Sequence, residues 1–280
     1  MAVITEDILT KVIKKRPSNS HKGNYGRVLL IGGSENYGGA IIMAAEAALN
    51  SGAGLISVAT HAVNLDALHA RNPEVMFIDW HDRNLVNLMK KMDVIVCGPG
   101  LGSSTFTRQL MSTICQNVSQ NQILILDASA LDMIDQDAKK IPTQIGLVVI
   151  TPHQMEWQRL SQIRIPYQTD SANLNALKKI FPTQNAVLVL KSNHTHIYTK
   201  ANQIFVNPLG NPGMATGGMG DTLAGIIGGF TAQFGNNLDS VLAAVFIHSL
   251  AGDKIAENNY VVRPTEISAM LPQLMSQYAN

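Results

Sequence analysis

The sequence has few cysteines, few aromatic residues, almost no net charge and no long hydrophobic run. Cys97 and Cys115 form no CxxC or metal-ligand spacing, so neither a disulfide framework nor a cysteine metal cluster is expected. Aromatic residues make up 5% of the chain, which disfavours a base-stacking platform for single-stranded nucleic acid. The 21 Lys and Arg nearly balance the 20 Asp and Glu, which argues against nucleic-acid and membrane-surface partners.

The N-terminus also lacks the features of a targeting segment. Met1 to Thr10 contains Glu6 and Asp7 and no apolar core of a signal peptide. No stretch approaches the ~20 apolar residues that span a bilayer. The short basic run 14–16 is typical of a solvated helix end. We therefore expect a cytoplasmic protein with small-molecule partners.

What the sequence does contain is a series of apolar, β-rich runs separated by helical stretches, with no repeat or linker. This organisation predicts one domain over residues 1–280. The runs are Arg27–Ile31, Leu55–Ala59, Val94–Cys97, Ile123–Leu126, Leu147–Ile150 and Ala186–Leu190. They are apolar throughout rather than alternating, as in a parallel sheet that helices cover on both faces. A three-layer α/β/α fold with a mostly parallel sheet is therefore expected, with a short antiparallel pair at 194–199 and 203–207.

Polar residues follow several of these runs, at the point where each expected strand ends. Gly98–Gly102, Asp127, His153 and Lys191 each come shortly after one of them. Glycine and aspartate are common in turns, which alone could account for any one of these positions. In open α/β sheets, however, ligands bind outside the carboxyl ends of the strands. Several polar strand ends together predict one shared small-molecule site.

The most informative segment is Gly217–Asp221, which precedes a helix with one apolar stripe. Glycine N–H groups and the positive end of a helix dipole form an anion site suited to phosphate. Asp221 could simply be the N-cap of the helix, or it could take a proton from a substrate hydroxyl beside that phosphate. A cap needs no glycine run before it, so we favour the catalytic role. Three glycines inside the helix, at 225, 228 and 229, predict the close approach of another element.

Two common nucleotide-binding motifs are missing. The sequence contains no GxxxxGK[ST], which excludes a P-loop enzyme. The first glycine-rich loop, Gly32–Gly39, does not spell GxGxxG, which disfavours a Rossmann dehydrogenase.

Gly217–Gly225 is similar to the signature of ribokinase-like phosphotransferases. Lys22–Gly26, Gly98–Gly102, Thr151–His153 and Leu190–Lys191 narrow the resemblance to the ADP- or ATP-dependent NAD(P)H-hydrate dehydratases, which repair hydrated nicotinamide cofactors. The resemblance runs from about His21 to the C-terminus. It implies a ribokinase-like fold and a stand-alone dehydratase without an epimerase domain.

The resemblance also implies roles for individual residues. Asp221 matches the catalytic residue, and the substrate contacts match Ala40, Gly100, Gly102, His153 and Asp221. The nucleotide contacts match Lys191, Ser192, Asn193, His194, Thr195, Gly217, Gly218 and Gly220. Glu156 resembles a residue that helps hold hydrated Mg²⁺ in sugar kinases. A physical argument supports Ala40, because it is expected to open a helix after a glycine loop, where a diphosphate could lie.

The implied reaction uses ADP or ATP with Mg²⁺ to phosphorylate the ring hydroxyl of NADHX or NADPHX. Loss of phosphate then restores NADH or NADPH. Two alternatives stay open: a kinase for a hydroxyethylthiazole- or hydroxymethylpyrimidine-type vitamin precursor, and a nucleotide-binding sensor without chemistry. Pro99, Gly102 and His153 favour the dehydratase, and the intact Asp221 argues against the sensor. The sequence departs from the family pattern at Ser129, Gln154, Met155, Ser192 and Met219.

A homo-oligomer, a tetramer, is a further implication of the resemblance. Its only residue-level support is the expected helix 238–257, which is apolar around most of its circumference, and burial within one subunit explains that equally well. Cys97 and His248 are expected to be core residues, the histidine with its hydrogen bonds satisfied. His194 and His196 alternate on an expected strand, but no third metal ligand is evident.

Overall fold

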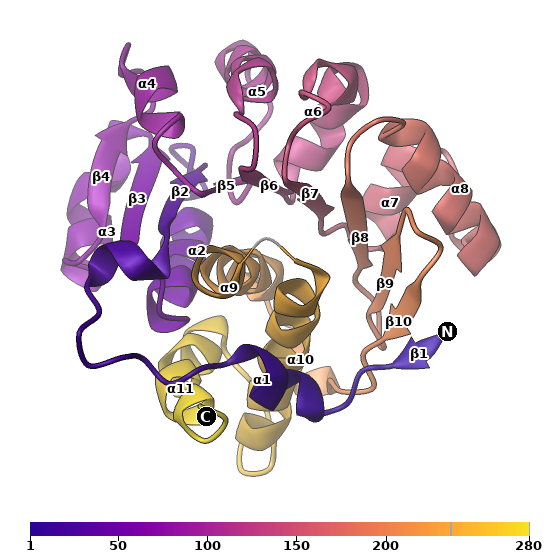
Figure 1. Cartoon of the computed structure of the whole chain (residues 1–280). Helices are drawn as coiled ribbons and strands as arrows, with labels where there is room; N and C mark the ends of the chain where they lie inside the picture. The colour runs from indigo at the N-terminus through magenta and orange to yellow at the C-terminus, as the bar shows by residue number, and fades with distance from the viewer. Residues whose placement is uncertain (236, 280) are drawn as a thin grey trace.

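The computed structural model describes residues 1–235 and 237–279, and within them ten strands form one sheet across the molecule (Figure 1). Their order is β1-β10-β9-β8-β7-β6-β5-β2-β3-β4. The parallel part consists of β2 (Arg27–Ile31), β3 (Leu55–Thr60), β4 (Met76–Asp79), β5 (Val94–Cys97), β6 (Ile123–Leu126), β7 (Leu147–Ile150) and β8 (Ala186–Leu190). β9 (His196–Thr199) is antiparallel to β8 and to β10 (Ile204–Val206), and β1 (Ala2–Val3) pairs with β10 at the edge.

The expected mostly parallel sheet is confirmed, and the six apolar runs all form strands within one residue of their expected bounds. β1 and β4 were not predicted, because neither is a fully buried apolar run: both residues of β1 are exposed, and β4 is only partly buried and ends at Asp79. His194 precedes β9, so the expected alternation of His194 and His196 along one strand is wrong. Lys191 instead forms a parallel bridge with His153, and the Ser192 hydroxyl closes a turn by donating to the His194 carbonyl.

Helices cover both faces of the sheet. One face carries α1 (Asp7–Val12), α2 (Gly38–Asn50), α9 (Met219–Phe234), α10 (Leu238–Ala256) and α11 (Pro264–Ser276), and Figure 1 shows them grouped together below the sheet. The other face carries α4 (Leu85–Met89), α5 (Thr105–Asn117), α6 (Ser129–Asp137), α7 (Gln154–Ser161) and α8 (Asp170–Ile180). The remaining helix, α3 (Leu65–Arg71), follows β3 and packs Leu68 into the first core. The three-layer α/β/α arrangement is confirmed.

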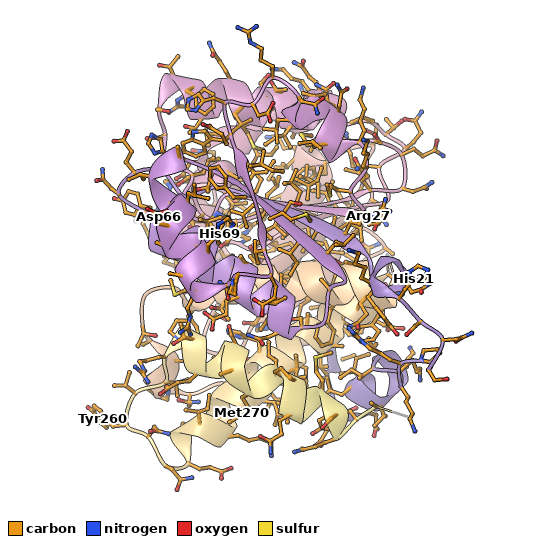
Figure 2. The ribbon with its side chains drawn as sticks, turned by 90° about the vertical axis from the view of Figure 1, so that its left-hand side faces the viewer. His21, Arg27, Asp66, His69, Tyr260 and Met270 are labelled. Atoms are coloured by element: carbon orange, nitrogen blue, oxygen red, sulfur yellow. The ribbon has the colours of Figure 1, made fainter. Side chains whose placement is uncertain are left out.

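Each face of the sheet has its own hydrophobic core, because successive side chains of a strand point to opposite faces. In β5, Val94 and Val96 belong to one core, whereas Ile95 and Cys97 belong to the other. All four side chains are fully buried, which explains why the strand is apolar throughout and confirms Cys97 as a core residue. The side view in Figure 2 separates the two helical layers, with Met270 of α11 in the lower one.

The glycines of α9 allow it to pack closely against α2 and the sheet. A Cβ at Gly225 would lie 2.1 Å from the backbone oxygen of Ala44 in α2. On the sheet side, a Cβ at Gly228 would lie 2.8 Å from Cγ2 of Val96. The predicted close approach is confirmed, and it fixes the N-terminus of α9 over the centre of the sheet.

The apolar character of α10 has an explanation within the subunit. α10 packs against α1, α9 and α11, and residues 240–249 are all buried in the single chain. The apolar run therefore gives no support to an oligomer. No helix in the described ranges is long and apolar enough to cross a membrane.

The order of the strands reverses between β2 and β5, and the loops that follow these two strands meet. Gly33 N donates to Pro99 O at 2.9 Å, and Ser34 N donates to Gly100 O at 2.7 Å. Such a switch point is the usual ligand-binding edge of an open α/β sheet. The fold therefore predicts a ligand-binding site at the carboxyl ends of β2 and β5–β8.

Candidate active site

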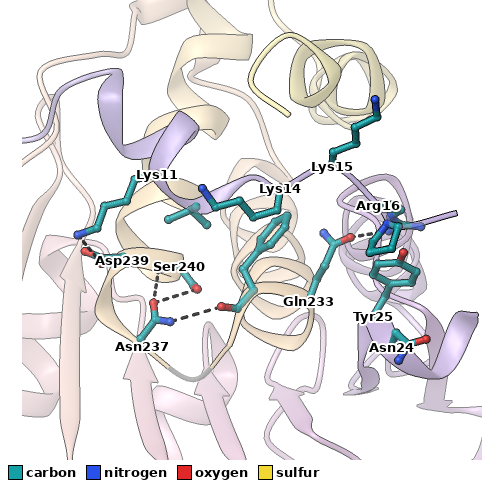
Figure 3. Close-up of a pocket in the computed structure, with 13 residues that line it drawn as sticks. Lys11, Lys14, Lys15, Arg16, Asn24, Tyr25, Gln233, Asn237, Asp239 and Ser240 are labelled. Atoms are coloured by element: carbon teal, nitrogen blue, oxygen red, sulfur yellow. Dashed lines mark hydrogen bonds and ion pairs between the residues drawn. The ribbon is translucent and has the colours of Figure 1, made fainter. Parts of the chain in front are cut away.

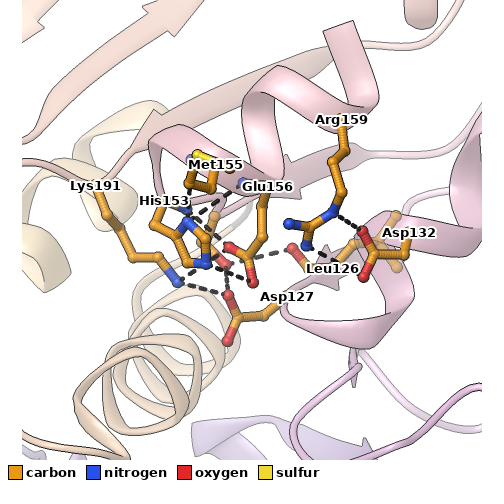
Figure 4. Close-up of polar contacts among 9 residues, drawn as sticks. Leu126, Asp127, Asp132, His153, Met155, Glu156, Arg159 and Lys191 are labelled. Carbon is orange, nitrogen blue, oxygen red and sulfur yellow. Dashed lines mark hydrogen bonds and ion pairs between the residues drawn. The ribbon is translucent and has the colours of Figure 1, made fainter. Parts of the chain in front are cut away.

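The polar residues that follow β6, β7 and β8 converge on the ammonium group of Lys191 (Figure 4). Lys191 Nζ donates to Oδ1 of Asp127 at 2.9 Å and lies 4.0 Å from Oε2 of Glu156. Asp127 is 1% exposed, and the Thr151 hydroxyl donates to the same Oδ1 at 2.7 Å. A Cβ at Gly220 would lie 2.9 Å from Lys191 Nζ, so the start of α9 passes directly beside this cation.

Asp221 lies in the first turn of α9, one residue after Gly220. The helix begins at Met219, and its N-cap is Gly218, which has a φ of +94°. Asp221 is therefore not the N-cap. Gly218 holds that position, in a left-handed conformation, three residues before Asp221. The N-cap explanation for this carboxylate is therefore excluded.

The surroundings of Asp221 shift its proton equilibrium toward neutral pH. Burial raises the pKa of Asp221 to about 6, with Asp127 and Glu156 adding to the rise and Lys191 opposing it. Burial lowers the pKa of Lys191, but the three carboxylates outweigh this effect and raise it overall. The site thus combines a permanent cation with a carboxyl group that can exchange a proton near neutral pH, as general bases require.

The start of α7 holds His153 and Glu156 beside Lys191. His153 is the N-cap, and its Nδ1 accepts from the N–H of Met155 at 3.1 Å and from that of Glu156 at 3.2 Å. In return, Oε2 of Glu156 accepts from His153 N at 2.8 Å. This reciprocal capping box fixes the carboxylate that faces Lys191.

A cavity of about 570 Å³ adjoins these groups, between the loop after β8 and the helices α9 and α10. Six of the predicted site residues line it: His153, Lys191, Ser192, Asn193, Thr195 and Gly220. His194 is outside the lining, with an exposed side chain and a carbonyl that accepts from Ser192. Gly217 is exposed and Gly218 packs against Met43, so neither of these two glycines lines the cavity.

The cavity also contains polar groups that the sequence did not predict to be site residues. His248 is 6% exposed, and its Nε2 has no hydrogen-bond partner in the described part of the chain. Burial lowers the pKa of His248 to about 4, so the ring is neutral. His248 is buried as expected, but its hydrogen bonds are not all satisfied, because Nε2 lacks a partner among the described residues and the residue lines the cavity. Asn211 Nδ2 donates to Asp253 at 2.8 Å while its Oδ1 has no partner among the described residues.

A single histidine in a 19-residue apolar helix was the available sequence signal for His248. Asp127 was visible as a strand end, but it became a site residue only once β6 and β8 were known to flank β7.

The predicted substrate residues Ala40 and Gly100 lie side by side at the switch point. Gly100 has a φ of +61°, and a Cβ there would lie 2.3 Å from Tyr37 O and 3.1 Å from Ala40 Cβ. α2 begins at Gly38, two residues before Ala40, because Tyr37 is the N-cap, so the expectation that Ala40 opens the helix is wrong by two residues. Gly102 lies near Ser34 and lines a different cavity, described below.

The basic run 14–16 borders another cavity, of about 370 Å³, beside the start of β2 and the end of α9 (Figure 3). Arg16 Nη2 donates to Gln233 Oε1 at 2.5 Å and to the Gly52 carbonyl, and its guanidinium lies 3.8 Å from the centre of the Tyr25 ring. α1 ends at Val12, so the run follows the helix rather than ending it. These contacts give Arg16 a structural role.

The family model of the NAD(P)H-hydrate dehydratases matches residues 28–273. The chain belongs to the NAD(P)H-hydrate dehydratase family. A relative from Lactiplantibacillus plantarum, named ADP-dependent (S)-NAD(P)H-hydrate dehydratase, is 50% identical over all of this chain and 99% of its own length. These findings confirm the family that the sequence resembled.

Two solved structures support the same assignment. A ribokinase-like superfamily protein from Enterococcus faecalis superposes with a TM-score of 0.93 at 47% identity, covering 99% of this chain and 96% of that one. The ADP/ATP-dependent NAD(P)H-hydrate dehydratase from Bacillus subtilis, co-crystallised with ATP/Mg²⁺, has a TM-score of 0.86 at 27% identity, covering 99% and 98%. The predicted ribokinase-like fold is confirmed.

The departures from the dehydratase pattern now have places in the structure. Ser192 and Met219 line the 570 Å³ cavity, where they can affect the fit of a ligand directly. Gln154 and Met155 form the first turn of α7, and Ser129 begins α6. Asp127, Lys191 and Asp221 are unaffected, so the charged centre of this dehydratase is intact.

Proposed function

We propose that this dehydratase removes water from the hydrated nicotinamide ring of NADHX or NADPHX, with ADP as the phosphoryl donor and ATP as an alternative. The observation that carries the proposal is the position of Asp221, a carboxyl group with a pKa of about 6, at the start of α9 beside Lys191. The name of the L. plantarum relative supports ADP as the donor.

The nucleotide occupies the 570 Å³ cavity, a volume within the range of small-molecule sites. Lys191 supplies a point charge to the phosphate oxygens, and the N–H of Gly220 and the dipole of α9 face the same anion. The loop 192–195 forms one wall of the cavity, with His194 contributing through its backbone. Gly217 and Gly218 shape the turn that brings Gly220 to Lys191.

The hydrated ring lies between His153 and the pair formed by Ala40 and Gly100, with its hydroxyl at Asp221. Asp221 accepts the proton of this hydroxyl as the oxygen attacks the terminal phosphorus of the nucleotide, and AMP leaves when the donor is ADP. The carbon–oxygen bond to the new phosphate then breaks, inorganic phosphate leaves with the electron pair, and the neighbouring carbon gives its proton to this phosphate, which restores the ring double bond. Lys191 balances the charge on the transferring phosphate.

Mg²⁺ fits this site as an ion that the phosphates of the nucleotide bind together with the protein. Among the side chains that the structure describes, no three from His, Cys, Asp or Glu form a metal site. Mg²⁺ commonly keeps several waters and binds through one or two carboxylates plus substrate phosphates. Glu156, held by its capping box, is the carboxylate that would help hold the metal, which would neutralise phosphate charge there.

A direct assay tests the proposed function. Protein, hydrated NADH and Mg²⁺ are mixed with ADP or ATP, and the absorbance of the dihydronicotinamide is followed. We expect the absorbance to return with either nucleotide, faster with ADP, and not without nucleotide. Accumulation of a stable phosphate ester would indicate a kinase instead. Binding of nucleotide without any turnover would indicate a sensor.

We propose a cytoplasmic homotetramer on the family resemblance alone, since α10 is buried within its own subunit. Light scattering at micromolar concentration tests the assembly, and a fully active monomer would contradict it.

A further inference from the structure

A cavity of about 390 Å³ lies at the same edge of the sheet as the active site, but on the other side of the switch point. It is lined by the loops after β2, β3, β4 and β5, and its wall includes Gly102, which lies two residues from Gly100 in the active site. The nucleotide cavity lies at β8, so the two cavities flank the proposed position of the hydrated ring.

The wall of this cavity is a cluster of rings. The rings of His81 and Phe106 stack, with centroids 4.2 Å apart and planes at 27°, and Trp80 lies 5.5 Å from Phe106. Trp80 is 5% exposed, and its Nε1 has no hydrogen-bond partner in the described part of the chain. Buried indole N–H groups usually have a partner, so this donor suggests that a ligand completes the site.

We propose that this cavity, which we call the ring pocket, holds the adenosine half of the dinucleotide substrate and prefers a free ribose 2′-hydroxyl. This inference rests on the proposed function, because it needs the reacting ring at Asp221. With the reacting ring at Asp221, the rest of the dinucleotide cannot enter the cavity at β8, because the phosphoryl donor occupies that cavity. It extends past Ala40 and Gly100 toward Gly102 and the aromatic wall of the ring pocket, where the base would pack.

The charge of the ring pocket decides between the two cofactors. Glu35 lines it, and no Lys or Arg is among its lining residues in the described chain. Oε1 of Glu35 lies 3.1 Å from Nε2 of His61. A carboxylate suits a ribose 2′-hydroxyl and repels a 2′-phosphate, for which an arginine is the usual partner. Hydrated NADH should therefore be the better substrate.

The test compares hydrated NADH with the hydrated reduced mononucleotide, which lacks the adenosine half. Phe106→Ala should raise KM for hydrated NADH about tenfold, leave kcat unchanged and leave KM for the mononucleotide unchanged. Phe106→Leu keeps much of the buried volume and should show the same split if the ring contact matters. Tyr167→Ala is the matched control, because this 64% exposed tyrosine lies outside the ring pocket. Glu35→Gln should raise kcat/KM for hydrated NADPH relative to hydrated NADH.

Titration with the products NADH and reduced mononucleotide gives the same comparison without turnover. A Phe106→Ala variant that weakens NADH alone supports the ring pocket even if neither hydrate reacts, and the missing reaction would then refute only the proposed function. Equal effects on both ligands, or no effect on either, would overturn the ring pocket while leaving the dehydratase intact.

Discussion

Asp221→Asn should strongly reduce turnover and at the same time stabilise the protein at neutral pH. Folding raises the pKa of Asp221 from 3.8 to about 6, and each pKa unit corresponds to 1.36 kcal/mol. The folded state therefore holds this proton more tightly than the unfolded state. Stability falls as pH rises from about 4 to about 6, and ionised Asp221 costs up to about 3 kcal/mol above that range.

The neutral amide removes this cost, so the free energy of unfolding at pH 7 should rise by about 1–3 kcal/mol. Urea unfolding at pH 7 and pH 4 measures it, and the gain should disappear at pH 4, where the native carboxyl is protonated. In the same variant kcat should fall by about 10²–10⁴-fold, because the amide cannot accept the hydroxyl proton.

Asp239→Asn is the matched control. Its carboxylate forms an exposed ion pair with Lys11 at 2.7 Å, so its loss should cost at most about 1 kcal/mol and leave turnover unchanged. An Asp221→Asn variant with the same gain at both pH values, or with no gain at pH 7, would refute the electrostatic reasoning.

Three further predictions follow from the same contacts. The acid limb of kcat/KM should lie near pH 6 and move to lower pH in Asp127→Asn, because the neighbouring negative charge is lost; an unmoved limb would show that another group titrates. Lys191→Met should weaken nucleotide binding more than hydrate binding in calorimetric titrations. A nucleotide affinity equal to that of the wild type would exclude a phosphate contact. Gly225→Ala should lower the unfolding free energy by about 1–3 kcal/mol through its clash with α2, whereas Gly39→Ala, where a Cβ meets nothing within 4 Å, should not.

Buried parallel strands were predictable because their signal is local. Four apolar residues such as Val94–Cys97 identify β5 without any knowledge of its neighbours. The glycine run before Asp221 and the lysine after β8 were also visible in the sequence, and the structure brings both to one place.

The rest of the site depends on contacts between distant segments. Asp127 joins the site through Lys191, 64 residues away, and His248 reaches it because α10 packs beside α9. The residue at which β9 begins also depends on a distant segment. Because Lys191 pairs with His153, His194 lies before β9 rather than in it. The ring pocket combines residues from four loops, which no single motif connects.

The product balance of one reaction tests the central claim most directly. Hydrated NADH, ADP and Mg²⁺ are incubated with the protein, and NADH, free phosphate and AMP are quantified over time. The account predicts that the three appear in equal amounts and that all three appear about 10²–10⁴-fold more slowly with Asp221→Asn. AMP formed together with a persistent phosphate ester, or NADH formed without AMP, would contradict it.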